Sequence, residues 1–305
     1  MSEICIKDIN AGVTTTPASF IKKAEDSYKG KIDFVIDGIR ERGAHILFIA
    51  GPSGSGKTTT AAIIAKRLRE LGRETFVISL DDFYRNIDDE GYPKNERDEP
   101  DFESVYALDL PLIESALLDV AANRPFSVPT FDFTTSRRSG MRSYPPIGSG
   151  VVIIEGLHAL NPKVSRHLPE GAAYRLFISV STNIVKESGQ RIISGRKLRF
   201  IRRTVRDSIY RSTSPMQTLK LWWGVRMGED QYLYPTRVYA DVEIDTFHSY
   251  ELSLLRPFVE SLITPEMASE SDFMKTVLAA ARQVEPIDIG MLPPDSLLRE
   301  FVPAR

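Results

Sequence analysis

A glycine-rich octapeptide between an apolar run and a helix-forming stretch constrains the fold of this chain more than any other feature. The run at residues 46–50 leads into GPSGSGKT at residues 51–58, and a segment rich in Ala, Ile and Leu continues to Leu71. Glycines let backbone N–H groups turn toward a phosphate chain, and the positive end of the following helix points at the same anion. The octapeptide fits G-x-x-x-x-G-K-[ST] and therefore predicts a strand, a phosphate-binding loop and a helix.

The side chains of this loop have expected contacts with a nucleotide. The Lys57 ammonium group can reach the β- and γ-phosphates, and the Thr58 hydroxyl can hold Mg²⁺. The Asn-Lys-x-Asp element of guanine-binding switch proteins is absent from the sequence, which argues against that class. We expect ATP and Mg²⁺ as cofactors, with the preference between ATP and GTP left open. The expected nucleotide contacts are Gly51, Ser53, Gly54, Ser55, Gly56, Lys57, Thr58 and Thr59.

Short apolar runs alternate with helix-like segments along the chain. This alternation is typical of a doubly wound parallel α/β sheet with helices on both faces. Strands are predicted at residues 46–50, 75–80, 151–154, 174–180 and 242–244. Two excursions interrupt the pattern, an acidic, turn-rich segment at 86–101 and an exposed hairpin or loop at 125–147. Long excursions in a compact domain are usually functional.

The expected organisation has three parts. Residues 1–42 are an N-terminal segment, irregular to residue 16 and then helical, that packs on the core. Residues 43–248 are the phosphate-loop domain, with a lid at 195–215, and residues 249–305 are a C-terminal helical extension.

Carboxylates follow two of the predicted strands. Asp81 and Asp82 come directly after the strand at 75–80. Ligands bind outside the carboxyl ends of strands in open α/β sheets, and successive strand side chains point in opposite directions, so one of the two is expected to face the loop. That carboxylate can accept the proton of an acceptor hydroxyl, and a pair of turn or helix-capping aspartates is the alternative. Glu155, after the run at 151–154, is the expected acid near Mg²⁺, or else an ordinary acid at a strand end.

Four arginines recur at helical spacing in the predicted lid. They fall within about 100° of arc on one helix face, and only Asp207 interrupts the row. Because guanidinium groups held together repel one another, an anion is expected against them, and a triphosphate is the natural candidate. A basic surface for RNA or an acidic partner is the alternative. The four are Arg199, Arg202, Arg203 and Arg206.

Composition argues against several other classes of protein. The chain has 305 residues, with 39 basic and 41 acidic ones, and this balance argues against a large surface for duplex nucleic acid. The single Cys5 cannot form an intrachain disulfide. The polar N-terminus lacks the core of a signal peptide, and no run approaches the ~18 apolar residues of a membrane span. We expect a cytoplasmic protein with a small-molecule partner and no membrane partner, and its oligomeric state stays open.

Six motifs, taken with their order and spacing, resemble the uridine kinase/phosphoribulokinase family over about residues 46–245. They are GPSGSGKTT (51–59), SLDDFYR (79–85), DEPDFE (98–103), PTFDF (129–133), IIEGLHALN (153–161) and RFIRRTVRD (199–207). The segments WWGVRMGED (222–230), YEL (250–252) and SLLREF (296–301) are similar to a bacterial uridine-kinase-like branch that often carries an N-terminal TGS-type domain, which we do not expect here. The resemblance implies the P-loop NTPase fold of nucleoside and nucleotide kinases.

The resemblance also implies roles for single residues. Asp81 matches the general base, and Tyr84 matches an aromatic residue beside the nucleoside. Asp98 falls on the acid that contacts the ribose, with Asp101 as the alternative because the segment differs in length. Glu155 matches the acid near Mg²⁺, and the four lid arginines match those around the phosphates.

The acceptor segment departs from the family pattern. Uridine/cytidine kinases carry Tyr-Asp-Phe and then a His that helps to read the pyrimidine, whereas this chain has Phe131 and Ser136 at those positions. A site built to hydrogen-bond a base loses discrimination when those groups are missing. Phe131 and Phe133 also alternate with a polar residue as in a half-buried strand, so core packing is their alternative role.

We therefore expect an ATP- and Mg²⁺-dependent kinase that acts on the ribose 5′-hydroxyl of a nucleoside. The same chemistry on pantothenate, a sugar phosphate or a non-pyrimidine nucleoside is a second hypothesis. A nucleotide-binding regulatory or RNA-associated protein without efficient turnover is a third. The identity of the acceptor and the roles of residues 1–40 and of the tail stay open.

Overall fold

A five-stranded parallel sheet forms the centre of the fold. The computed structural model describes residues 2–304. The strand order is β10-β7-β2-β6-β3, and every neighbouring pair is parallel. The strands are β2 (Ile46–Ala50), β3 (Thr75–Ser79), β6 (Val151–Glu155), β7 (Ala173–Ser179) and β10 (Val242–Asp245). The predicted doubly wound α/β sheet is confirmed, since β6 and β3 lie on one side of β2 and β7 and β10 lie on the other.

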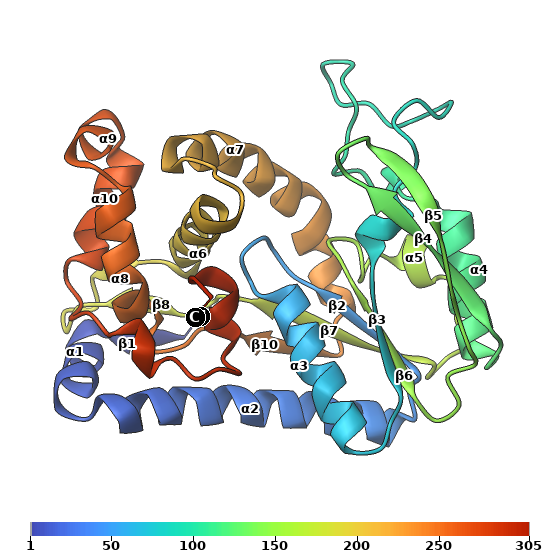
Figure 1. Ribbon diagram of the computed structural model, residues 1–305, viewed down its shortest axis with the longest axis horizontal. Helices are drawn as coiled ribbons and strands as arrows, with labels where there is room; N and C mark the ends of the chain where they lie inside the picture. Colours follow the sequence, from blue (N-terminus) through green and yellow to red (C-terminus); the bar gives the residue numbers. More distant parts are fainter. Residues whose placement is uncertain (1, 305) are drawn as a thin grey trace.

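Both faces of this sheet are buried. Leu47 and Ile49 of β2 pack in one hydrophobic cluster, whereas Ile46, Phe48 and Ala50 pack in a second cluster on the other face. Burial on both faces explains why the strands read as continuous apolar runs. The first cluster includes α2 (Pro17–Arg42) and α3 (Lys57–Glu70), and the second includes α4 (Leu110–Ala121) and α5 (Pro162–Ser165) (Figure 1).

A β-hairpin stands beside one end of the sheet. Its strands β4 (Phe126–Asp132) and β5 (Arg137–Tyr144) pair antiparallel, so the predicted excursion at 125–147 is a hairpin. The turn-rich segment expected at 86–101 lies in a long loop between η1 (Leu80–Phe83) and α4, and this loop also contains η2 (Val105–Ala107). The hairpin and the loop lie on the same side of the molecule (Figure 1).

The two ends of the chain meet in a second structural unit. Strand β1 (Glu3–Cys5) pairs parallel with β8 (Asn183–Val185), which pairs antiparallel with β9 (Arg191–Ile193). Asn10 bonds both the Gln283 carbonyl oxygen, at 2.9 Å, and the Glu285 N–H, at 2.8 Å. The helical elements are α1 (Ile6–Thr15), α8 (Glu251–Leu262), α9 (Pro265–Glu270), α10 (Asp272–Ala281), η5 (Ile289–Met291) and η6 (Leu297–Phe301). The expectation that residues 1–16 are irregular is wrong, because a three-residue strand and a short helix are too brief for a clear periodicity.

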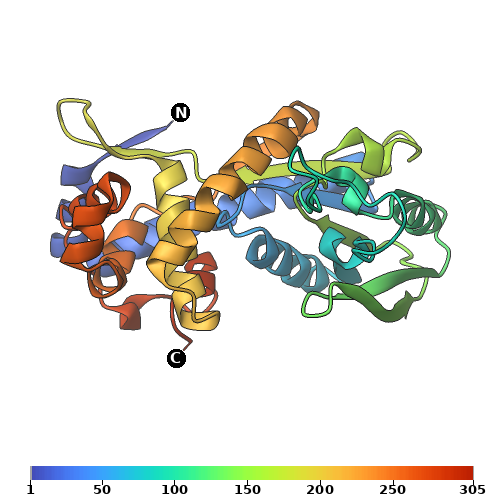
Figure 2. The ribbon, with the colours of Figure 1, turned by 90° about the horizontal axis from the view of Figure 1, so that it is seen from above.

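The predicted lid is a pair of helices. Helices α6 (Gly195–Tyr210) and α7 (Pro215–Gly228) run between the terminal helices and the sheet (Figure 2), and one π-helical turn η3 (Glu229–Leu233) and the 3₁₀ segment η4 (Tyr234–Tyr239) follow. Trp222 is fully buried, with its ring centroid 5.6 Å from that of Phe200, whereas Trp223 is half-exposed against Phe273. None of the helices within residues 2–304 is long and apolar enough to cross a membrane.

We predict that Trp222→Ala lowers the free energy of unfolding by about 3–5 kcal/mol, because it leaves a cavity between α6 and α7. Trp223→Ala is the matched control, and its half-exposed ring should cost less than about 1 kcal/mol. Urea denaturation followed by far-UV circular dichroism measures both. Equal losses for the two variants would contradict the packing of this helix pair.

Candidate active site

A cavity of about 300 Å³ opens at the carboxyl ends of β2, β3 and β6. Open parallel sheets bind their ligands at this edge. The wall of the cavity comes from the phosphate loop, the segments after β3 and β6, the lid and the C-terminal end of the chain. Its charged residues are Lys57, Asp81, Glu103, Glu155, Arg203, Arg206, Arg211, Glu229 and Glu300.

The phosphate loop, residues 51–58, has the backbone shape that its glycines allow. Gly54 and Gly56 take left-handed φ angles of 74° and 88°, and a Cβ on Gly54 would lie 2.8 Å from the backbone oxygen of Arg199. Helix α3 begins at Lys57, and the free N–H groups of a first helical turn point out of that end. The Lys57 Nζ atom lies 3.5 Å from the Pro52 carbonyl oxygen, so this side chain folds back over the loop. The loop and the lysine form a cradle that fits a polyphosphate.

Thr58 and Glu155 meet in the cavity. The Thr58 hydroxyl donates to Glu155 Oε1 at 3.4 Å, and Glu155 is buried at the end of β6. A hydroxyl and a carboxylate are oxygen ligands that Mg²⁺ accepts. Within residues 2–304, no group of three or more His, Cys, Asp or Glu side chains could hold a metal by itself. This pair therefore fits an ion that takes its remaining ligands from phosphates and water.

Asp81 and Asp82 point to different neighbours. Both lie in η1, a single 3₁₀ turn after β3, rather than in the strand itself. Asp81 lines the cavity, whereas Asp82 forms an ion pair with Arg142 of the hairpin. Only one of the two acids faces the phosphate loop, and the 3₁₀ turn, not strand alternation, separates them.

The surroundings of Asp81 raise the pKa of its carboxyl to about 6. Surrounding protein removes much of the water that would solvate the charge, although the side chain still reaches the solvent of the open cavity. The negative charge of Glu155 raises this pKa further, and the positive charge of Lys57 opposes the rise. A carboxylate with a pKa close to neutrality suits proton transfer at physiological pH.

Three aromatic rings gather where the hairpin meets η1. The Tyr84 ring centroid lies 5.6 Å from that of Phe131 and 6.3 Å from that of Phe133, and the two phenylalanine rings are 5.2 Å apart. The Phe133 side chain is 63% exposed, so it is not a core residue. Ser136 lies in the hairpin turn with a left-handed φ of 53°. The cluster leaves an open apolar surface beside the cavity.

Neither Asp98 nor Asp101 is among the residues that line the cavity, and their contact with a ribose stays a prediction. Asp98 is exposed and pairs with Lys94 at 2.8 Å, away from the cavity lining. Asp101 accepts a hydrogen bond from the Tyr232 hydroxyl at 2.8 Å. Glu103, which the sequence analysis missed, lines the cavity instead, and burial together with neighbouring acids raises the pKa of its carboxyl. The loop has no periodicity that would have set this register from sequence.

Arg199 is buried beneath the phosphate loop rather than facing a ligand. It forms a two-bond ion pair with Glu229, at 2.8 and 2.9 Å, and donates to the Ser53 carbonyl oxygen at 2.8 Å. Glu229 in turn accepts a hydrogen bond from the Ser53 N–H at 2.8 Å. Arg199 thus fixes the backbone of the loop.

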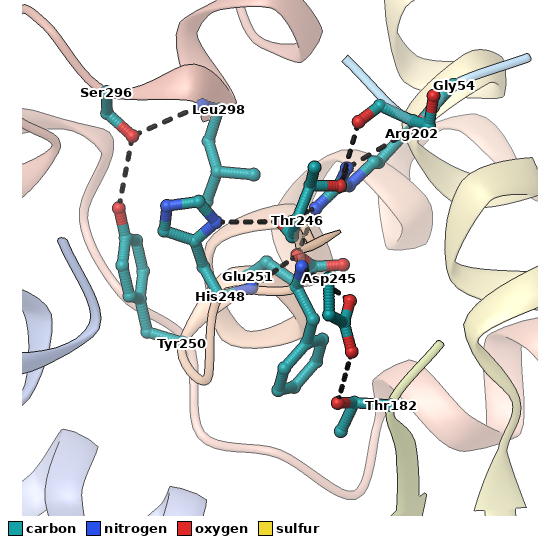
Figure 3. A network of polar contacts seen from close by, with 12 residues as sticks. Gly54, Thr182, Arg202, Asp245, Thr246, His248, Tyr250, Glu251, Ser296 and Leu298 are labelled. Atoms are coloured by element: carbon teal, nitrogen blue, oxygen red, sulfur yellow. Dashed lines mark hydrogen bonds and ion pairs between the residues drawn. The ribbon is translucent and has the colours of Figure 1, made fainter. Parts of the chain in front are cut away.

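Arg202 makes a second buried contact of the same kind (Figure 3). It pairs with Glu251 and donates to the carbonyl oxygens of Gly54, at 3.4 Å, and Thr246, at 2.9 Å. The expectation that all four lid arginines face one anion is therefore corrected for Arg199 and Arg202. Acids far away in the sequence neutralise them.

Arg203 and Arg206 line the cavity, together with Arg211, which the motif analysis did not include. Arg203 donates to the Ser53 hydroxyl at 2.9 Å, and burial lowers the pKa of this guanidinium. The Asp207 carboxylate lies 3.2 Å from the guanidinium group of Arg203, 2.9 Å from that of Arg206 and 3.5 Å from that of Arg211. This shared acid keeps the three cations together at one side of the cavity.

Comparison with known proteins places this chain in a family. A model of the phosphoribulokinase/uridine kinase family matches residues 46–253. The chain belongs to this family. Family membership makes it a small-molecule kinase with a P-loop fold. The residues before 46 and after 253 lie outside the match.

Two uridine kinases agree with this placement in sequence. The uridine kinase of Lactobacillus helveticus is 31% identical over 198 residues, which cover 65% of this chain and 84% of that protein. The uridine kinase of Staphylococcus aureus is 28% identical over 225 residues, 72% of this chain and 98% of that one. Among solved structures, one described as a possible uridine kinase from Bacillus stearothermophilus aligns with a TM-score of 0.46 and 18% identity, and covers 72% of this chain and 100% of that one.

We predict that Arg202→Met lowers the free energy of unfolding by about 3–5 kcal/mol, because it leaves the Glu251 carboxylate buried without a cation. Arg203→Met is the matched control, and its loss should stay within about 1 kcal/mol because Asp207 keeps two other partners. Urea denaturation measures both. The double variant Arg202→Met/Glu251→Leu should recover most of the loss, and equal losses for the two single variants would contradict this assignment.

We also predict that Asp81→Asn stabilises the protein at pH 8 and that the gain shrinks toward pH 4. Folding raises the pKa of this carboxyl from 3.8 to about 6, so its charge opposes folding above pH 6 and ceases to do so below 3.8. Thermal unfolding at several pH values measures the gain. Asp82→Asn is the control and should not raise the melting temperature, because it breaks the pair with Arg142. A gain for Asp81→Asn that is independent of pH would contradict the pKa.

Proposed function

We propose that this protein transfers the γ-phosphoryl group of ATP, with Mg²⁺, to the 5′-hydroxyl of a nucleoside. The observation that carries the proposal is the meeting of two groups in one cavity, the Asp81 carboxyl and the phosphate loop with Lys57. A base beside a polyphosphate cradle is what phosphoryl transfer to a hydroxyl requires. Membership of a kinase family supports it.

Different residues of the cavity serve different steps of the reaction. The loop amides and Lys57 bind the phosphate oxygens, and Thr58 and Glu155 would hold Mg²⁺. Bound MgATP supplies the phosphoryl group with part of its charge neutralised. The Asp81 carboxylate takes the proton of the acceptor hydroxyl while the oxygen of that hydroxyl forms the new P–O bond and the bond to ADP breaks.

The lid arginines act in two ways. Arg203 and Arg206, at the cavity surface, stabilise the negative charge on the transferred group. Arg199 and Arg202 are positioning residues, because they contact the carbonyl oxygens of the loop and not the cavity.

The acceptor side of the cavity favours a neutral, flat molecule with hydroxyl groups. The Tyr84, Phe131 and Phe133 rings offer faces to a planar base. Glu103 lies at the cavity wall, where a carboxylate can accept hydrogen bonds from ribose hydroxyls. Since the pyrimidine-reading Tyr and His are replaced by Phe131 and Ser136, we propose the nucleoside class rather than uridine alone.

The hairpin charges weigh against an anionic acceptor. Three hairpin arginines each pair with an aspartate outside the hairpin, so their positive charges are already neutralised. The pairs are Arg137–Asp88, Arg138–Asp109 and Arg142–Asp82. Pantothenate and sugar phosphates, which carry negative charge, fit this side less well than a nucleoside.

An acceptor panel tests the proposal. The purified protein is incubated with MgATP and, in turn, uridine, cytidine, adenosine, guanosine, pantothenate and ribulose 5-phosphate, and ADP release is followed. We expect release that depends on a nucleoside, with a nucleoside 5′-monophosphate identified by mass spectrometry. Asp81→Asn should lower this rate by roughly 10²–10⁴-fold while ATP affinity changes little, and Asp82→Asn should retain most of the rate. The wild-type kcat/KM should fall below about pH 6 as Asp81 becomes protonated.

The panel also separates the competing functions. Dependence on pantothenate or a sugar phosphate alone would overturn the nucleoside assignment. ATP binding without any dependent acceptor would favour a regulatory nucleotide-binding protein. An Asp81→Asn variant that keeps most of its rate would refute the base assignment.

A further inference from the structure

The C-terminal 3₁₀ helix η6 places a carboxylate inside the phosphate cavity. Glu300 Oε2 accepts a hydrogen bond from the Thr59 hydroxyl at 2.5 Å, and Glu300 Oε1 lies 3.4 Å from Nη1 of Arg206. Glu300 also lines the cavity. Thr59 is the residue after Thr58 in the first turn of α3, and Arg206 belongs to the lid. The Glu300 carboxylate therefore contacts a hydroxyl and a guanidinium group, and both groups are suited to bind a phosphate.

The charge balance of the cavity singles out Glu300. Four other acids line the same space, and each has a different assignment in the proposed function or the fold. Asp81 is the base, Glu155 would hold Mg²⁺, Glu103 faces the acceptor, and Glu229 is neutralised by Arg199. Glu300 instead adds a second carboxylate to Arg206, which already pairs with Asp207 at 2.9 Å and which a bound triphosphate would need.

We propose that Glu300 holds the place of a nucleotide phosphate group, so that ATP must displace its carboxylate in order to bind. The inference rests on the proposed function for the identity of the anion. A carboxylate and a phosphate both accept hydrogen bonds from a hydroxyl and a guanidinium group, and they repel each other when they share one site. The end of the chain thus lowers the affinity of the protein for ATP and offers Arg206 and Thr59 an anionic partner when the nucleotide is absent.

The backbone of η6 is fixed by its packing, so only the Glu300 side chain moves when a phosphate replaces its carboxylate. Leu297, next to the phosphate loop, would be 2.8 Å from a Cβ on Gly56. Ser296 begins the turn, and its hydroxyl donates to Glu25 at 2.7 Å and accepts from the Leu298 N–H at 3.2 Å. Figure 3 shows Ser296 and Leu298 beside Tyr250, whose hydroxyl lies 3.3 Å from that of Ser296.

The Glu300 side chain can turn toward solvent. The Glu300 side chain is 19% exposed, whereas Leu297, Leu298 and Phe301 are fully buried around it. Rotation of the glutamate toward solvent releases Thr59 and Arg206 without any movement of the segment. The displaced carboxylate then regains water, which reduces the cost of the exchange.

The Glu300→Gln variant tests the inference, because glutamine keeps the shape and can still accept from Thr59 but carries no charge. We expect it to bind ATP about three- to tenfold more tightly than the wild type at low ionic strength, measured by calorimetry without an acceptor. The gain should be smaller in 0.5 M salt. Tripolyphosphate should show the same gain, and adenosine should show none.

Glu285→Gln is the matched control, since it removes one negative charge from an exposed position of the C-terminal unit. It should leave ATP affinity within about twofold of the wild type. Melting temperatures of both variants establish that they are folded. Unchanged or weaker ATP binding by Glu300→Gln, or an equal gain with Glu285→Gln, would overturn the inference.

The readout separates this inference from the proposed function. If ATP binds but no acceptor is phosphorylated, the nucleoside kinase assignment fails, whereas the effect of Glu300→Gln on affinity can still be measured. If neither the wild type nor the variant binds ATP or tripolyphosphate, the phosphate site is refuted, and this inference is refuted with it.

Discussion

Two buried guanidinium groups hold the carbonyl oxygens of the phosphate loop, and the geometry of the site depends on them. Arg199 binds the Ser53 carbonyl oxygen and Arg202 binds that of Gly54. In a trans peptide group the C=O and the following N–H point in opposite directions, so these two contacts fix the orientation of two peptide groups of the loop. Buried charges of this kind are tolerated only when they are paired. Glu229 and Glu251 therefore support the shape of the loop together with its glycines.

The sequence predicts those parts of the site that depend on local order. The phosphate loop, the central strands and the position of Glu155 at a strand end follow from residues adjacent in the chain, and the structure has them as expected. The acids that pair with the arginines are a different case. Arg199 and Glu229 are 30 residues apart, and Arg206 and Glu300 are 94 apart, so no spacing rule connects them. The spacing of the four arginines therefore predicts one anion-binding face, although two of the four are internal.

The inward-facing residues of irregular segments are not predictable from sequence for another physical reason. The loop between η1 and α4 has neither a helical nor a strand period, and therefore nothing in its sequence determines which acid faces inward. Asp98 and Asp101 were the candidates, whereas Glu103 lines the cavity. Strands β1, β8 and β9 have three residues each and are likewise too short for a pattern to emerge. Tertiary packing against the terminal helices, not local propensity, stabilises them.

The buried Arg202–Glu251 pair has a consequence for the rigidity of the cavity. Tilting α6 would pull one of two fully buried charges away from its partner, and so the arginine-bearing half of the cavity is a stationary wall. The hairpin lies beside the cavity, and its ion pairs with Asp82 and Asp88 are partly exposed and can exchange with water, whereas its Arg138–Asp109 pair is more buried. The buried pair therefore makes the lid side of the cavity the more rigid side, and the ion pairs of the hairpin are the easier ones to break.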